Sequence, residues 1–291
     1  MKALVRAVAV AVAAVVTTVV QAQSPHSFIW KVSSSAGSAY LVGSVHVLAK
    51  DYYPLAPALE AAYKGSDLLV EEMNLDEITT PDAQMRTLAR GLLPGGQTLD
   101  MVVSPTTYAL VTARTQSLGL PLEPLKRFKP WMLALTVVAL EWQKAGFDDA
   151  YGLDRHFFDR AKAEGKPIQG FESADFQLGL LDGLSAADQD RMLAESLKES
   201  ETELGSVAAL AMAWKNGDAP TIERLVLSDM KDDPVMYNRL LADRNRAWVP
   251  AFEALLARKA RPFVVVGAAH LVGPDGLLAL LKARGYSLEQ L

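Results

Sequence analysis

Residues 262–270 read PFVVVGAAH, an apolar run that ends in a glycine and is followed, three residues later, by a histidine. A shorter version of the same pattern, YLVGSVH, stands at residues 40–46, near the other end of the chain. A short apolar run that stops at a turn-forming residue predicts a buried strand. In α/β folds, ligands and catalytic groups gather beyond the carboxyl ends of strands. We therefore expect both ends of the chain to meet at one sheet edge and to bring His46 and His270 together.

The composition of the 291-residue chain excludes several classes of function. It contains no cysteine, so disulfides, a thiol nucleophile, a thiolate metal site and a lipid anchor on cysteine are all excluded. The net charge is −5 and no basic patch stands out, so we expect no nucleic-acid binding. A Gly-x-Ser-x-Gly elbow, a phosphate-binding loop, a dinucleotide fingerprint and a His-Glu-x-x-His helix are also absent from the sequence.

The first residues resemble a secretory signal. Lys2 and Arg6 precede an apolar run at 7–20, and small residues lead up to Ala22. This pattern predicts a signal peptide at 1–22 that is removed, and a periplasmic or secreted mature chain at 23–291 forming a single domain. The apolar run is shorter than the roughly 20 residues needed to span a bilayer, and no later segment is long enough, so no stable membrane span is expected.

The remaining pattern predicts an α/β (mixed α+β) fold. A central mixed β-sheet is formed by the N- and C-terminal segments and is covered by a large, mostly helical middle region at 76–260. Strands are expected at 28–33, 39–43, 67–72, 167–171, 262–267 and 285–288. Helices are expected at 59–64, 80–90, 105–118, 130–144, 152–164, 174–184, 186–215, 220–229, 234–259 and 274–284, many of them bounded by proline or glycine.

His46 and His270 are the leading candidates for chemistry, because a neutral imidazole is both a general base and a common metal ligand. The glycine before each histidine is expected to permit a turn. Glu71 and Glu72 end a predicted buried strand, where neighbouring side chains point to opposite faces, so only one of them faces the site. That carboxylate either completes a metal site or orients a base, or else both glutamates simply begin a polar loop.

Other charged residues are weaker candidates. Glu172 follows a predicted strand and either reaches the same edge or caps the next helix. Asp154 lies at a helix start, where the helix dipole favours acids. Arg244 either forms an ordinary salt bridge or stabilises negative charge in the site. The two remaining histidines, His26 and His156, are interpreted as structural.

At these residues the chain resembles the TraB/GumN family, which includes bacterial pheromone-shutdown proteins and the animal Tiki proteins. The resemblance rests on the paired Gly-x-x-His motifs and covers nearly the whole mature chain. The stretch LVEEMNL at 69–75 is similar to a family strand whose glutamate precedes an Asp or Asn by two residues, which selects Glu72 over Glu71. Supporting landmarks are KPW at 129–131, YGLD at 151–154, GKPI at 165–168 and RN at 244–245.

The resemblance implies an erythromycin-esterase-like fold and a metal-dependent peptidase activity of the Tiki kind. We accordingly expect an exported hydrolase acting on a peptide or a small-molecule substrate. His46, Glu72 and His270 would hold one divalent ion, which with nitrogen and oxygen ligands is manganese, cobalt or zinc. Glu71 or Glu172 would serve as the base, and Arg244 would steady developing negative charge.

Two other functions remain open at this stage. His46, His270 and Glu72 would also suit a hydrolase that activates water for ester cleavage without a metal. Alternatively, the protein captures a peptide or signalling molecule between the sheet and the helices and catalyses nothing.

Overall fold

The computed structural model describes residues 26–198, 200–228, 230 and 233–291. The predicted signal peptide at 1–22 lies outside the described residues. The centre of the fold is a six-stranded sheet in the order β4-β3-β5-β2-β1-β6. The strands span Ile29–Ser34 (β1), Gly37–Ser44 (β2), Leu68–Met73 (β3), Ile168–Glu172 (β4), Pro262–Gly267 (β5) and Ser287–Gln290 (β6).

Strands from the two ends of the chain lie next to one another, as the sequence predicted. β1 pairs antiparallel with both β2 and β6, and β2 pairs in parallel with β5. β5 also pairs in parallel with β3, which pairs in parallel with β4. The four neighbouring strands β4, β3, β5 and β2 therefore share one carboxyl edge, where side chains distant in sequence are brought together.

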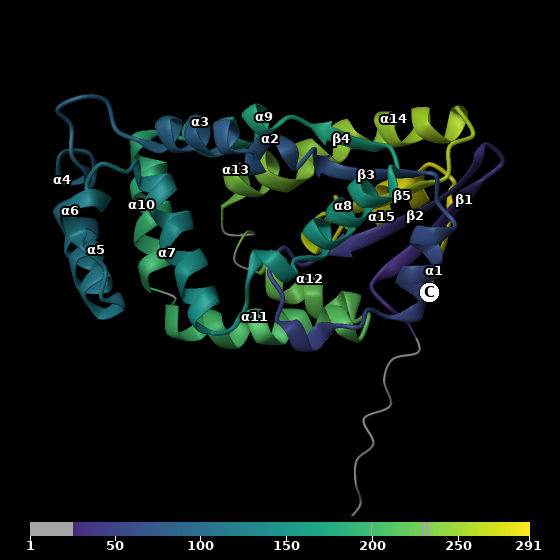
Figure 1. Ribbon diagram of the computed structural model, residues 1–291, viewed down its shortest axis with the longest axis horizontal. Coiled ribbons are helices and arrows are strands. Elements are labelled where there is room, and N and C mark those ends of the chain that lie inside the picture. Colours follow the sequence, from purple (N-terminus) through teal and green to yellow (C-terminus); the bar gives the residue numbers. More distant parts are fainter. Residues whose placement is uncertain (1–25, 199, 229, 231–232) are drawn as a thin grey trace, which may run out of the picture.

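Helices cover both faces of this sheet (Figure 1). On one face Tyr63 of α1 (Pro57–Lys64) and Phe157 of α8 (Leu153–Glu164) pack edge-on against Phe263 of β5. The opposite face carries α14 (Asp243–Ala257), which contacts β2, and α15 (Leu277–Ala283), which contacts β6. β5 is buried along its whole length because it is covered from both sides.

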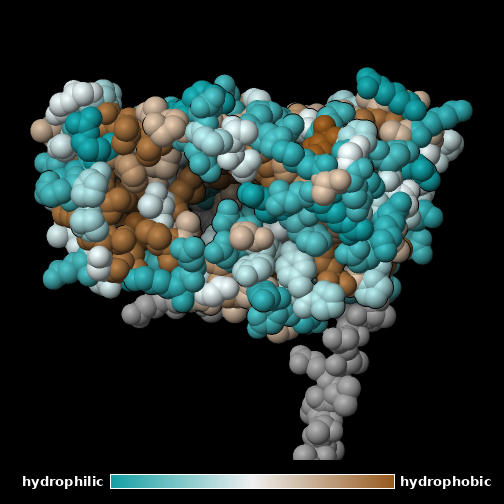
Figure 2. All heavy atoms as spheres, in the orientation of Figure 1, coloured by the Kyte–Doolittle hydropathy of each residue, from teal (hydrophilic) through white to brown (hydrophobic). Residues whose placement is uncertain are grey.

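Part of the middle region packs on itself beyond the sheet. Helix α10 (Ala186–Lys198) lies against α5 (Pro105–Leu118) and α7 (Pro130–Lys144), on the left of Figure 1. These helices have their own apolar core, which includes Leu99, Val111 and Leu193. The helical region therefore both covers the sheet, as expected, and extends past its edge, so that a hollow is left between the two parts (Figure 2).

The other helices connect these layers. They are α2 (Asp76–Thr79), α3 (Pro81–Gly91), α4 (Leu99–Val102), α6 (Leu122–Leu125), α9 (Ala174–Asp182), α11 (Ser200–Lys215), α12 (Ala219–Leu227) and α13 (Pro234–Tyr237), with 3-10 turns at Lys50–Tyr52, Asp149–Tyr151 and Ala268–His270. No helix in the described ranges is long and apolar enough to cross a membrane.

Of two long helices predicted from the sequence, one is divided and the other is continuous but changes its helical pitch. The run at 186–215 forms α10 and α11, because the first packs on α5 and α7 whereas the second packs mainly on α12 and α7. The run at 234–259 forms α13, a π-helical segment at Asn238–Ala242 and then α14. Apolar periodicity continues through both runs and does not reveal a change of packing partner or of helical pitch.

Candidate functional site

Four parallel strands deliver the candidate residues to the carboxyl edge of the sheet. His46 follows β2, Glu72 lies near the end of β3, Glu172 ends β4, and His270 closes the turn after β5. Helix α14 adds Arg244 directly after the π-helical segment. The structure therefore brings together all the residues that the sequence had singled out, with the exception of Glu71, which faces away from Glu72.

The opposite orientation of Glu71 and Glu72 follows from the alternation of side chains along β3. Glu71 lies opposite Val265 in the sheet register, on the face covered by α8. Glu72 points to the other face, where its Oε1 accepts a hydrogen bond of 2.8 Å from the backbone N–H of Gly267. The two carboxylates therefore occupy different environments.

Glu72 lies among cations and hydrogen-bond donors. Its Oε2 accepts hydrogen bonds from Arg244 Nη2 at 2.5 Å and from Gln177 Nε2 at 3.1 Å. Burial alone would raise the pKa of Glu72, but the neighbouring His270, Arg244 and His46 favour its charged form and lower the pKa to about 2. Glu72 is therefore a carboxylate throughout the physiological range.

The ring of His270 is held in one tautomer. Its Nδ1 lies 2.6 Å from the side-chain oxygen of Asn245, and the Asn245 amide nitrogen donates to the backbone carbonyl of Asp275 at 2.9 Å. Because Asn245 presents its oxygen, Nδ1 carries the hydrogen and Nε2 keeps its lone pair. Burial lowers the pKa of His270 to about 4, so the ring is neutral at neutral pH.

His46 is oriented in the same way by a different partner. Its Nδ1 lies 3.0 Å from Oδ1 of Asp154, which also accepts a hydrogen bond from the hydroxyl of Ser44. The charge of Asp154 is the main cause that raises the pKa of His46 to about 9. With Nδ1 directed at Asp154, the other ring nitrogen, Nε2, points into the site.

Gly267 marks the point on which these groups converge. A Cβ atom built on this glycine would lie 3.1 Å from His46 Nε2, 3.2 Å from Glu72 Oε1 and 3.6 Å from His270 Cδ2. At Gly43 a Cβ would collide with the ring of Phe28, 2.2 Å away. Neither glycine has a positive φ, so the backbone conformation itself does not require a glycine at either position. Both provide space, Gly267 for the site and Gly43 for packing beneath it.

Arg244 is fixed by Glu172. The guanidinium donates from Nε and Nη2 to the Glu172 carboxylate, at 2.8 to 3.1 Å, and Trp248 Nε1 donates to the same group at 2.8 Å. Arg244 Nη1 in turn lies 3.1 Å from His270 Nε2. Glu172 thus has its oxygens fully engaged, which is the environment of a side chain that positions an arginine rather than of a free base.

Arg244 bonds to both His270 and Glu72 at the place where a cation would sit. Within the described ranges, no group of three or more His, Cys, Asp and Glu side chains is arranged to hold a metal ion. His270 Nε2 and Glu72 Oε1 are 3.7 Å apart, and the lone pair of His270 accepts a hydrogen bond from Arg244. A cation at this point would have to replace that hydrogen bond and the proton on His46.

Comparison with known proteins assigns the chain to a family. The model of the TraB/PrgY/gumN family matches residues 28–290. The chain belongs to the TraB/PrgY/gumN family. The resemblance drawn from the paired Gly-x-x-His motifs is thereby confirmed, and the matched range includes every residue of the site described above.

The chain is also similar to two proteins named YbaP. It is 26% identical over 245 residues to the uncharacterized protein YbaP of Shigella flexneri, covering 84% of this chain and 88% of that protein. The YbaP of Escherichia coli strain K12 is likewise 26% identical, over 244 residues, with 84% and 87% coverage. An uncharacterized protein of Treponema pallidum is 21% identical over 270 residues, with 88% and 80% coverage. No solved structure gives a significant match.

Several residues of the site escaped the sequence analysis. Asp154 had been weighed only as a helix-start acid, and Asn245 only as a neighbour of Arg244, although both belong to family landmarks. Trp248 and Gln177 carried no signal at all, because a tryptophan and a glutamine at helical positions are ordinary. Their roles arise from tertiary packing, which brings α9 and α14 over the end of β4.

Proposed function

We propose that this TraB/PrgY/gumN member is a hydrolase that uses a divalent ion, manganese, cobalt or zinc, held by His46, Glu72 and His270. One observation carries the proposal: both imidazoles have Nδ1 tied to an acceptor, so that both Nε2 atoms are directed toward the same carboxylate. Metal-binding histidines are commonly oriented in this way by a carboxylate or carbonyl partner.

The donor set and the charge of the site fit a divalent cation. Two imidazole nitrogens and a carboxylate suit manganese, cobalt and zinc, and Gly267 leaves room between them. Glu72 and Glu172 contact the guanidinium of Arg244, and Asp154 contacts His46, so that with His46 neutral these groups carry an excess of two formal negative charges. An ion of charge two would balance that excess after displacing the proton of His46.

A bound divalent ion would supply a water of lowered pKa and would polarise the scissile carbonyl. The protein's own residues orient the reaction. Arg244, fixed by Glu172, places its Nη1 atom beside His270 Nε2. Once an ion takes the lone pair of His270, that N–H is free to donate to an oxygen that gains negative charge. Asp154 keeps the His46 ring in place, and Gln177 holds Glu72.

Substrate reaches this centre through a largely apolar cleft of about 500 Å³ between the sheet and the helical block, corresponding to the hollow in Figure 2. The cleft touches the site at His46, Glu72 and Arg244, and its far walls include Leu135 and Leu210. Its shape and lining suit a peptide or a small apolar molecule. The leader-like residues 1–22 support action in the periplasm or outside the cell.

The test is metal binding followed by peptide cleavage. Chelator-treated protein is titrated calorimetrically with Mn²⁺, Co²⁺ and Zn²⁺, and a peptide library is then incubated with the reloaded protein. Wild type and His26→Ala, which changes an exposed histidine outside the site, should bind the metal and cleave. A His46→Ala, His270→Ala double variant should do neither. Equal metal occupancy in wild type and double variant would remove the proposal.

A second candidate is a hydrolase that needs no metal. It is favoured by two contacts that the histidine rings make without a metal. Arg244 donates a hydrogen bond to His270, and His46 is hydrogen-bonded to Asp154. His46, His270 and Glu72 would then activate water directly. Ester or peptide hydrolysis that survives exhaustive chelation, but is lost in Glu72→Gln, would favour this candidate.

A further inference from the structure

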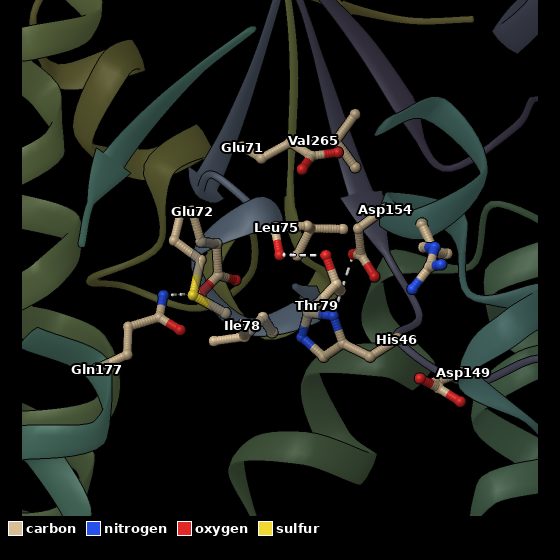
Figure 3. Close-up of a pocket in the computed structure, with 12 residues that line it drawn as sticks. His46, Glu71, Glu72, Leu75, Ile78, Thr79, Asp149, Asp154, Gln177 and Val265 are labelled. Atoms are coloured by element: carbon tan, nitrogen blue, oxygen red, sulfur yellow. Dashed lines mark hydrogen bonds and ion pairs between the residues drawn. The ribbon is translucent and has the colours of Figure 1, made fainter. Parts of the chain in front are cut away.

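A separate pocket of about 310 Å³ opens beside the candidate centre on the α8 face of the sheet (Figure 3). Its apolar walls are formed by Leu75 and Ile78, and Val265 lies deep within it. Figure 3 shows Glu71 beside Val265, with Asp154 between Glu71 and His46. The pocket contacts the centre itself, because His46 and Glu72 line both this pocket and the apolar cleft.

Glu71 is the unusual member of this pocket. The residue is 2% exposed, and neither of its carboxyl oxygens has a hydrogen-bond partner among the described residues. A buried polar group without a partner destabilises a fold, so such groups are rare and call for an explanation. Glu72, one residue later, has three donors, so the contrast is not a general property of this strand.

The charges around Glu71 determine which kind of ligand could supply its missing hydrogen-bond donor. Glu72, Asp149 and Asp154 add carboxyl groups to the same pocket, and the imidazole of His46, which also lines it, is already paired with Asp154 at 3.0 Å. The only guanidinium in the lining, that of Arg155, is paired with Asp159 at 2.8 Å. The pocket therefore attracts a cation, while its aliphatic walls require a ligand that also carries apolar groups.

We propose that this pocket binds a primary ammonium group of the substrate, carried on an aliphatic stem, with Glu71 accepting a hydrogen bond from the ammonium nitrogen. An ammonium group has three donors and no acceptor, which suits a pocket rich in carboxyl oxygens. The stem packs against Leu75, Ile78 and Val265. The chain that carries it then passes His46 and Glu72 and continues into the apolar cleft.

This inference rests on the proposed function only in placing the scissile bond between the two pockets. It names a substrate class: a molecule with an ammonium group on one side of that bond and apolar groups on the other. Two sources share this chemistry, the free amino terminus of a peptide and the side chain of a lysine. They differ in whether the ammonium lies next to the backbone or at the end of a longer stem.

Binding without turnover separates this inference from the proposed function. Metal-free protein is titrated by calorimetry with three ligands: L-leucinamide, Nα-acetyl-L-lysinamide and the uncharged Nα-acetyl-L-norleucinamide. The first carries only an α-ammonium, the second only a side-chain ammonium. Wild type should bind at least one of the two cations about 10-fold or more tightly than norleucinamide, and the preferred cation identifies the source. Because no metal and no cleavage are involved, failure of the hydrolase proposal leaves this result unaffected.

Variants tie the preference to Glu71. Glu71→Leu should abolish the preference for the cation, and Glu71→Gln, which keeps the size and one acceptor oxygen, should reduce it several-fold. Asp100→Asn removes a charge from an exposed residue in the separate helical block and should leave it unchanged. Thermal unfolding checks that each variant is folded. Equal binding of neutral and cationic ligands by wild type, or an undiminished preference in both Glu71 variants, overturns the proposal.

Discussion

Oδ1 of Asp154, in the first turn of α8, lies 3.0 Å from Nδ1 of His46, in the loop after β2. The contact joins segments 108 residues apart and fixes which nitrogen of His46 points into the site. It also explains the charge of the ring, since Asp154 is the largest cause of the raised pKa of His46. A substitution of Asp154 should therefore change the pKa of His46 more than that of any other group.

We expect Asp154→Asn to lower the pKa of His46 from about 9 toward the ordinary value of 6.5. The amide oxygen still accepts from Nδ1, so the ring stays in place while the charge that favoured its protonation is lost. NMR titration of the imidazole C–H signals of metal-free protein measures the shift, with His26 as an internal reference. If the His46 pKa stayed near 9, Asp154 would not be its cause.

Glu71→Gln should stabilise the protein at neutral pH. Burial raises the pKa of Glu71 to about 10, so the folded state keeps a proton that the unfolded state releases above about pH 4.5. The folded state therefore incurs no penalty from Glu71 below about pH 4.5, and the free energy of unfolding decreases as the pH rises from there toward 10. The isosteric amide has no such loss, so we expect the variant to gain about 3 kcal/mol at pH 7.

Urea unfolding of both proteins at several pH values checks this expectation. The difference in free energy of unfolding should be smallest near pH 4.5 and should grow by about 1.4 kcal/mol for each pH unit above it. Glu195→Gln, at an exposed position of α10, serves as a control for the loss of an acid. A difference that does not change with pH would mean that Glu71 is ionised in the folded protein.

Gly267→Ala should block the centre without unfolding the protein. The backbone of Gly267 has φ −50°, which alanine adopts freely, but the added Cβ would lie 3.1 Å from His46 Nε2 and 3.2 Å from Glu72 Oε1. We expect Mn²⁺, Co²⁺ or Zn²⁺ affinity to fall by about tenfold or more, as for disturbed metal surroundings. The matched control is Gly95→Ala, whose Cβ would meet nothing within 4 Å. Calorimetric titration of both variants decides the matter, and unchanged affinity in Gly267→Ala would place the ion elsewhere.

These residues also show how far the sequence alone leads. The apolar run at β5 predicted a buried strand with its correct bounds, because a strand that is covered on both faces consists of apolar residues at consecutive positions. The chain ends were expected to meet for the same reason. The Asp154–His46 contact was not foreseen, because nothing local to either residue specifies a partner so distant along the chain. Gly267 was expected to permit a turn that a Cβ would obstruct, but the sequence could not show which groups that Cβ would approach, namely His46 Nε2 and Glu72 Oε1.

Arg244 has the largest expected effect on stability. Its side chain is 9% exposed, and it is shared by Glu72 and Glu172, whose side chains are 14% and 8% exposed. Arg244→Met would leave both carboxylates without their guanidinium partner, and removal of one member of a buried ion pair costs about 3–5 kcal/mol. Urea unfolding at pH 7 should show a loss of this size. A loss below about 1 kcal/mol would mean that the guanidinium contributes no more than a surface pair does.

The double variant Arg244→Met, Glu172→Gln tests whether the loss of stability in Arg244→Met comes from the buried carboxylates that are left without a guanidinium partner. Once Glu172 is neutral, one of the two unpaired carboxylates is gone, so the double variant should be more stable than Arg244→Met alone. Glu172→Gln by itself should be destabilising, because the amide replaces an acceptor for Arg244 and Trp248 with a donor. The resulting coupling energy in a double-mutant cycle should be between about 0.5 and 3 kcal/mol, as for residues in one buried network. Additive effects would show that Glu172 and Arg244 act independently, and Arg244 would then be held in place by its other partners, Glu72, His270 and the Leu240 carbonyl.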